Sequence, residues 1–377
     1  MKTDGRRISV RRRRRASSSA PASSTRASYA RAAHALGACA ALALACSKTF
    51  AQQAPQTALA PAGDQARSIG DLWWLFFYVL SAVWVIVVAA TLFAFVKGRG
   101  RKAGSEDVPD APEVVPDPLY ERRKTYAVGG ALALTVAILF VFLVSSFLTG
   151  RNVSSMSSGG SVFIEVRAHQ WWWEVRYTDA TSSNTFTTAN EIHIPVGRPV
   201  QLKLSSTDVI HSFWVPNLSG KKDAIPGKET TLFLNADREG IFRGQCAEFC
   251  GHQHAHMAFL VVAESPEKFA AWQQQQRQPA AQPSEPVSQR GQQVFMTSPC
   301  VMCHTIAGTQ AGSNVGPNLT HVGSRQTIAA ATLANTSGHL SGWVSDAQGV
   351  KPGSRMPPNN LTPDDLQALV AYLQSLK

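Results

Sequence analysis

Two long apolar runs stand out in the first half of the chain. Leu72–Val96 is 25 residues long without a charged side chain, and Tyr126–Leu148 adds 23 more. Each run exceeds the roughly 20 apolar residues that a helix needs to cross the hydrocarbon core of a bilayer. The pattern therefore predicts a transmembrane helix hairpin over residues 65–150, with spans at 72–96 and 126–148.

The charges around this hairpin predict its orientation. Seven basic residues lie between or beside the two runs: Lys97, Arg99, Arg101, Lys102, Arg122, Arg123 and Lys124. Short loops rich in Lys and Arg stay on the cytoplasmic side, so everything after Thr149 is expected outside. Neither run contains a histidine, an acid or a base. Because a haem or ion path inside the bilayer needs such groups, the hairpin is expected to anchor the chain and to pack against another subunit.

Beyond residue 161 the apolar positions alternate with polar ones. The segments that alternate are "SVFIEVR", "WWWEVRY", "EIHIPVG", "VQLKLSS", "TTLFLNA" and "MAFLVVA". Short strands separated by Gly, Pro, Asn and Asp clusters are typical of a β-sandwich or barrel, here over residues 161–263. The Gln- and Pro-rich stretch 264–288 is expected to be a flexible linker, which leaves residues 289–377 as a further domain.

Charge is concentrated at the N-terminus. Residues 1–51 hold eleven Lys and Arg but one acid, whereas the other 326 residues carry 25 basic and 24 acidic side chains. A folded part this close to neutrality is unlike a nucleic-acid-binding surface. The basic start, a short apolar run and a plausible small-residue cleavage site after Ala51 predict an export signal over 1–51. A lipoprotein site at Cys39 or Cys46, or an organellar transit peptide, are the alternatives.

The stretch "GQCAEFCGHQHAHM" concentrates metal-binding side chains in the loop before the last predicted strand. A disulfide between Cys246 and Cys250 and a structural zinc site are two interpretations. Copper is the third, because thiolate, imidazole and thioether ligands together suit it. Met257 favours copper, and so does His211, which "TDVIHSFWVP" places at a strand end as a distant ligand. Two thiolates can bridge two copper ions and spread one electron over both.

At this point the sequence resembles a known family. "TDVIHSFWVP", "DAIPGK", "CAEFCGHQHAHM" and "HQWWWEVRY" resemble subunit II of cytochrome c oxidase, and a two-helix anchor before the sandwich matches as well. The resemblance implies a cupredoxin-like Greek-key β-sandwich with a dinuclear CuA centre. The copper ligands that it implies are His211, Cys246, the backbone carbonyl of Glu248, Cys250, His254 and Met257.

The same resemblance assigns further roles. The Glu248 side chain is expected to face a magnesium site at the junction with the catalytic subunit. Trp171 corresponds to the surface aromatic through which electrons arrive, so we expect it to be exposed and Trp173 to lie in the core. Glu121 is one residue out of register with the glutamate that the family ties to a proton path, and its role stays open.

The C-terminal region carries a second cofactor motif. In "SPCVMCHTIAG" the spacing C-x-x-C-H is the attachment pattern of a c-type haem, with Cys300 and Cys303 as thioether partners and His304 on the iron. Met356, 52 residues beyond His304, is far enough along the chain to reach the other face. His321 and His339 are rival sixth ligands. The region resembles the small all-α class I cytochrome c.

Together these features predict the subunit of a caa3-type cytochrome c oxidase that receives electrons. Electrons would pass from haem c to CuA and on to a partner subunit that reduces O2 to water and pumps protons. The expected partners are catalytic subunit I, other oxidase subunits, cytochrome c or another donor, and the membrane, but no nucleic acid. The expected location is the bacterial inner membrane, with copper and haem on the periplasmic side. A CuA-containing nitric oxide reductase subunit and a membrane-anchored copper chaperone are the alternatives.

Overall fold

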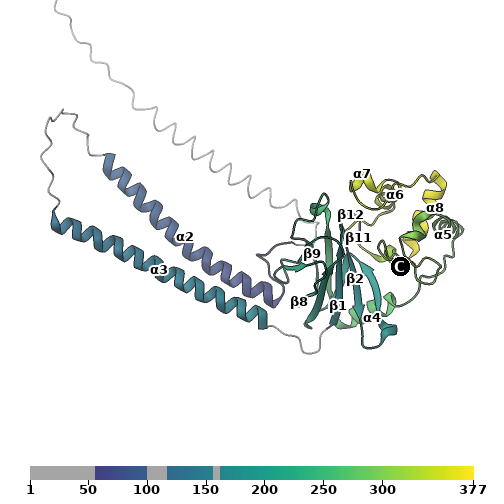
Figure 1. Ribbon diagram of the computed structural model, residues 1–377, viewed down its shortest axis with the longest axis horizontal. Helices are drawn as coiled ribbons and strands as arrows, with labels where there is room; N and C mark the ends of the chain where they lie inside the picture. The colour runs from purple at the N-terminus through teal and green to yellow at the C-terminus, as the bar shows by residue number, and fades with distance from the viewer. Residues whose placement is uncertain (1–55, 100–116, 156–161) are drawn as a thin grey trace, which may run out of the picture. The chain divides into compact units, whose positions relative to one another are not determined.

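The computed structural model describes residues 56–99, 117–155 and 162–377. The predicted export signal, including Cys39 and Cys46, and most of the basic loop between the apolar runs lie outside these residues. The described part contains two long helices, a β-sandwich and a small helical domain (Figure 1).

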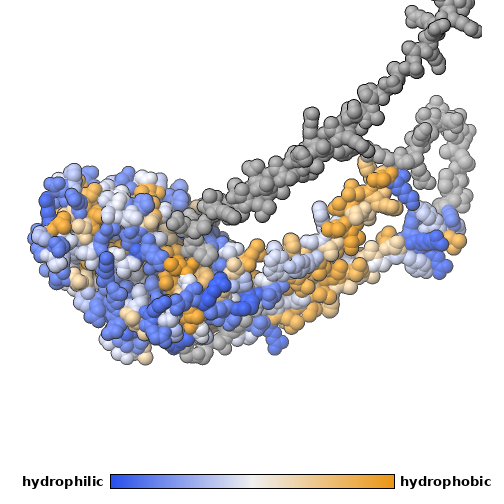
Figure 2. Space-filling model, turned by 180° about the vertical axis from the view of Figure 1, so that it is seen from behind, coloured by the Kyte–Doolittle hydropathy of each residue, from blue (hydrophilic) through white to orange (hydrophobic). Residues whose placement is uncertain are grey.

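The two apolar runs form the helices α2 (Asp64–Arg99) and α3 (Pro118–Ser155), which run side by side in Figure 1. The rings of Phe76 and Phe142 stack between them with centroids 4.1 Å apart. Most other large apolar side chains of the hairpin are exposed, and they form the orange band of Figure 2. Apolar surface of this extent needs lipid or another subunit to cover it. Each predicted span lies within one helix that is long and apolar enough to cross a membrane, as fits a membrane-anchored subunit.

The start of α2 is seated on the β-sandwich. Ala62 is buried, its amide donates to the carbonyl of Asn217, and its carbonyl accepts from the amide of Asp237. Arg67, one turn into the helix, pairs with the carboxylate of Asp237. A side chain at Gly63 would collide with the carbonyl oxygen of Asn235 at 2.4 Å. These contacts fix the helix end to the domain that follows in the chain.

The sandwich consists of two five-stranded sheets. The first sheet has the order β3 (Phe186–Ala189), β2 (Trp172–Thr178), β1 (Val162–His169), β5 (Val200–Ser206) and β8 (Thr230–Leu234). The second has the order β4 (Glu191–Pro195), β10 (Ala258–Glu264), β9 (Gly240–Cys246), β6 (His211–Trp214) and β7 (Lys222–Ala224). Strand β1 pairs in parallel with β5, and β10 pairs in parallel with β4, so the chain crosses between sheets.

The alternation in the sequence places one face of each strand inward. In β1 the side chains of Ile164, Val166 and Ala168 are buried while their neighbours point away. Trp173, fully buried as expected, packs edge-on against Phe213 and Phe259 of the opposite sheet. The cupredoxin-like β-sandwich predicted from the sequence is therefore confirmed.

Part of the expected flexible linker, 11 residues long, is an ordered helix. Helix α4 (Pro266–Gln276) starts at Ser265, whose hydroxyl accepts from the amide of Lys268. Phe269 is buried in the sandwich core, and the indole of Trp272 stacks on His193 with centroids 4.1 Å apart. The two aromatic residues in the Gln-rich stretch bury an amphipathic face, and that face overrides the disorder suggested by composition.

The last domain packs helices α5 (Pro286–Thr297), α6 (Ser337–Ser345), α7 (Ala347–Val350) and α8 (Pro363–Ser375) around one core. Helices α5 and α8 cross where a side chain at Gly291 would lie 2.0 Å from the carbonyl oxygen of Ala368. The hydroxyl of Thr362 caps α8 by accepting from the amide of Asp365, as the sequence predicts. A two-strand hairpin, β11 (Thr327–Ile328) and β12 (Leu333–Ala334), faces the sandwich.

Candidate metal centre and haem site

The predicted copper residues come from two neighbouring elements of the second sheet. His211 is the first residue of β6, Cys246 is the last residue of β9, and the other residues lie in the loop from β9 to β10. The Sγ atoms of Cys246 and Cys250 are 3.7 Å apart. A disulfide requires about 2.05 Å, so the two cysteines are free thiols in the described part of the chain.

The other candidate ligands divide between the two sulfurs. Nδ1 of His211 lies 3.8 Å from the sulfur of Cys246, and the carbonyl oxygen of Glu248 lies 3.1 Å from the same sulfur. Nδ1 of His254 lies 3.6 Å and Sδ of Met257 lies 3.8 Å from the sulfur of Cys250. Each cysteine therefore has an imidazole and one further donor beside it.

This donor set fits two metal ions better than one. Within the described residues, His211, Cys246 and Cys250 form a group whose ligand atoms lie within 4.8 Å of one another, and His254 falls outside that group. Ligands of one tetrahedral zinc, bound at about 2.0–2.3 Å, lie less than about 4 Å apart. A zinc ion also has no use for the buried thioether of Met257. The residues thus fit a dinuclear copper centre, which the two thiolates, the two imidazoles and the thioether would hold.

The electrostatics of the site favour a thiolate at Cys246 and the protonated forms of Cys250 and His211. A hydrogen bond with Cys250 and the neighbouring His211 lower the pKa of Cys246 to about 3. The same hydrogen bond and burial raise the pKa of Cys250. Burial lowers the pKa of His211, but its contacts with Cys246 and Asp208 raise it overall. Asp208 Oδ1 lies 2.8 Å from Nε2 of His211 and thereby orients the ring with Nδ1 toward the sulfur.

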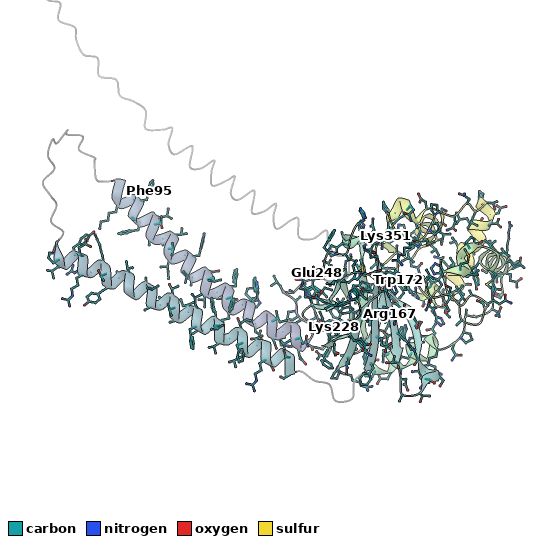
Figure 3. All side chains as sticks on the ribbon, viewed as in Figure 1. Phe95, Arg167, Trp172, Lys228, Glu248 and Lys351 are labelled. Atoms are coloured by element: carbon teal, nitrogen blue, oxygen red, sulfur yellow. The ribbon has the colours of Figure 1, made fainter. Side chains whose placement is uncertain are left out.

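The remaining charged and imidazole groups of the loop lie at the surface. The carboxylate of Glu248, labelled in Figure 3, is about half exposed and lies 3.8 Å from Nζ of Lys221. His252 and His256 are exposed, and Nδ1 of His256 lies 2.8 Å from the side-chain oxygen of Gln253. Neither of the two histidines contacts a cysteine sulfur in the structure.

Trp171 differs from the expectation. It is only 9% exposed, and its indole Nε1 donates to the carbonyl oxygen of Cys250 at 2.8 Å. The loop that carries Lys351 and Gly353 covers it: Nζ of Lys351 donates to the Trp171 carbonyl oxygen at 3.0 Å. The predicted exposure is wrong because the chain's own C-terminal domain occupies the surface in front of this tryptophan.

The C-x-x-C-H motif borders a cavity of about 260 Å³. Most of its lining is apolar and comes from the C-terminal domain, including Phe295, Leu340, Trp343 and Leu373. Cys300 and Cys303 are free and half-buried at its wall. Trp171 and Trp172 close the cavity on the side of the sandwich. An apolar cavity beside two free thiols and an imidazole fits a covalent haem.

His304 and Met356 both line this cavity. Nδ1 of His304 lies 2.7 Å from the carbonyl oxygen of Pro317, which leaves Nε2 free for iron. Burial lowers the pKa of His304, so the ring stays neutral as an iron ligand requires. The rival histidines are engaged elsewhere: His321 binds the carbonyls of Lys377 and Gln278, and His339 binds that of Ala334.

Sequence reasoning missed two residues of this region. Asp208, three residues before His211, orients that ligand, and its i to i+3 spacing was a usable signal. Lys351 carried no signal, because nothing in the sequence indicates that its ammonium group meets a backbone carbonyl 180 residues away.

Comparison with known proteins supports the identification of both the β-sandwich and the C-terminal helical domain. Residues 180–264 match the family of the cytochrome c oxidase subunit II periplasmic domain, and residues 288–377 match the cytochrome c family. Cytochrome c oxidase subunit 2 of Alkalihalophilus pseudofirmus is 35% identical over 334 residues, which cover 85% of this chain and 91% of that protein. The Bacillus subtilis subunit 2 is 28% identical with the same two coverages.

A solved structure of the periplasmic domain of cytochrome oxidase subunit II from Bradyrhizobium japonicum is 28% identical to this chain. It covers 32% of this chain and 97% of that structure, with a TM-score of 0.31. The full-length relatives and both family matches agree, and the chain belongs to the cytochrome c oxidase subunit 2 family, with a cytochrome c domain fused at its C-terminus.

Proposed function

We propose that this chain is the electron-accepting subunit of a haem-copper terminal oxidase. Electrons pass from a c-type haem to a dinuclear CuA centre and on to a separate catalytic subunit that reduces O2 to water with proton pumping. The membership in the subunit 2 family and the fused cytochrome c domain support this function. The copper pair and the haem supply one-electron redox chemistry; the described spans of this chain hold no group for O2 chemistry.

The observation that carries the proposal is the pair of free thiols 3.7 Å apart, each with its own imidazole. We assign His211, Cys246, the Glu248 carbonyl, Cys250, His254 and Met257 to copper. We assign Cys300, Cys303, His304 and Met356 to haem c. Because a His/Met pair raises the reduction potential of a haem, this assignment suits a carrier that feeds copper.

The remaining parts of the molecule fit such an assembly. The two exposed apolar helices anchor the subunit in the membrane. We place the anchor in the bacterial inner membrane, with copper and haem on the periplasmic side, and expect catalytic subunit I to cover part of the hairpin. The half-exposed carboxylate of Glu248 is a candidate ligand for magnesium at that junction, with Lys221 as its present partner.

The function is tested on the purified membrane complex that contains this chain. Metal analysis is expected to find two coppers and one covalent haem in this subunit, and the complex is expected to consume O2 when the haem is reduced. Cys250→Ser removes one bridging sulfur and should abolish the mixed-valence copper spectrum. One zinc and no copper in the subunit, or reduction of NO in place of O2, would overturn the proposal.

A further inference from the structure

The C-terminal domain is bound to the sandwich by a built polar interface around the copper loop. Three hydrogen bonds join the hairpin β11–β12 to the sandwich. The amide of Ala258 donates to the carbonyl oxygen of Ala330 at 3.2 Å, and the Arg243 side chain donates to that of Ala331 at 3.3 Å. The hydroxyl of Thr332 donates to the carbonyl oxygen of His256 at 3.4 Å. The turn of this hairpin holds three consecutive left-handed residues, Ala329, Ala330 and Ala331, with φ of 54–57°. This conformation is unfavourable for alanine, because its Cβ comes too close to the following carbonyl oxygen.

The three carbonyl groups of the strained turn each accept a hydrogen bond. Ala330 and Ala331 present their oxygens to strands β10 and β9, and Ala329 presents its oxygen to Lys351. Backbone strain of this kind persists only where the surrounding contacts hold it. The turn is therefore shaped by its contact with the copper domain and with Lys351.

Lys351 is an enclosed cation of this interface. Lys351 is only 3% exposed, and its Nζ donates to the carbonyl oxygens of Trp171 at 3.0 Å and Ala329 at 3.2 Å. Burial lowers the pKa of Lys351 to about 7. Burying an ammonium group is costly unless hydrogen bonds compensate, and an exposed lysine would avoid that cost. Its position is thus tied to the two carbonyls that it joins.

We propose that Lys351 is a positioning residue that locks the haem domain in one orientation on the copper domain, by joining the backbone of Trp171 to the strained turn at Ala329. The inference rests on the proposed function. Lys351 lies in the same loop as Met356, which lines the haem cavity, and Trp171 donates from its indole to the carbonyl of Cys250. The Lys351 side chain therefore connects the loop that lines the haem cavity to Trp171, which contacts the copper loop. Lys351 and Trp172, the neighbour of Trp171, are labelled in Figure 3.

A fixed orientation matters because the rate of electron transfer falls steeply as the distance between the two centres grows. A haem domain that is released and re-docks would make transfer wait for a diffusive search. Since Trp171 is covered in the docked arrangement, an external cytochrome does not reach it and must deliver its electron to the haem. The fixed orientation therefore determines both where electrons enter, at the haem, and how fast they pass from haem to copper.

The test uses Lys351→Met in the full complex, which keeps the length of the side chain but removes the donor. Hydrogen exchange of the Ala258 amide reports docking, because that amide donates to the haem domain. We expect exchange at Ala258 to accelerate at least tenfold, and transfer from haem to copper to slow at least tenfold and become dependent on viscosity. Exchange within α5 and α8 and the haem and copper spectra should stay unchanged. Lys377→Met, at the exposed C-terminal residue, is the matched control.

A second pair of variants covers the case in which Lys351→Met does not assemble. Ala330→Gly tolerates the left-handed turn and should keep Ala258 protected, whereas Ala330→Val cannot adopt it easily and should expose Ala258. Unchanged exchange and viscosity-independent transfer in Lys351→Met, or equal protection in the two Ala330 variants, would overturn the inference. Absence of haem-to-copper transfer in the unaltered complex would instead contradict the proposed function.

Discussion

At the scale of single residues, Met356 is the candidate second ligand that would complete the coordination of the haem iron together with His304. Met356→Leu removes the thioether but keeps an apolar side chain in the cavity wall. We expect the haem to stay attached through Cys300 and Cys303, its reduction potential to fall, and its iron to bind carbon monoxide. Visible spectroscopy with and without carbon monoxide, together with a redox titration, measures all three.

The control for this change is Met302→Leu. Met302 lies inside the attachment motif and is 66% exposed, so it cannot serve as the distant ligand. An unchanged spectrum and potential in Met356→Leu, or a carbon monoxide complex in Met302→Leu, would show that the sixth ligand lies elsewhere.

The histidines of the copper loop offer a second comparison between neighbours. His254→Ala removes the imidazole 3.6 Å from the sulfur of Cys250, so we expect loss of copper from the subunit and of its mixed-valence spectrum. His252→Ala changes an exposed side chain two residues away and should keep both. Copper analysis of the two purified variants shows whether His254 binds copper. Equal copper content in both variants would remove His254 from the ligand set.

At the scale of secondary-structure elements, the haem domain depends on the close crossing of α5 and α8. Gly291→Ala places a methyl group 2.0 Å from the carbonyl oxygen of Ala368. Overpacking of this kind costs about 1–3 kcal/mol of stability. Gly338→Ala in α6 meets nothing within 4 Å and should not destabilise the domain. Chemical denaturation followed at the haem compares the variants, and equal midpoints would mean that the helices can move apart freely.

The elements also show how far sequence reasoning extends. Alternation and uncharged length predicted the hairpin and the long strands, because both signals are local. The short strands β3 and β7 were not predicted, since three or four residues carry too little periodicity. Helix α4 was mistaken for a linker because the buried Phe269 and the partly buried Trp272 outweigh a Gln-rich composition. Spacing and the family resemblance supplied the candidate metal and haem residues, whereas the covering of Trp171 depends on contacts between domains and left no trace in its own segment.

At the scale of the whole molecule, each part has one role in electron transfer. The helix hairpin anchors the chain, and the haem domain and the copper domain carry the electron path. The region after Thr149 is almost neutral, with 17 basic and 16 acidic residues, so long-range steering between its domains is weak. Arg355 lies 3.9 Å from Asp208, an ion pair near the interface that salt screens. Hydrogen bonds, including both from Lys351, are short-range and resist salt. Screening acts over about 8 Å at physiological ionic strength, so it affects free partners more than domains already in contact.

We expect the haem and the copper centre of this one chain to form a single intramolecular electron path. The most direct measurement reduces the haem by flash photolysis in the purified complex and follows the reduction of copper. We predict first-order transfer whose rate is independent of the concentration of the complex and changes less than tenfold from low to high salt. A rate proportional to concentration, a fall of tenfold or more with salt, or no electron arriving at copper would contradict the account.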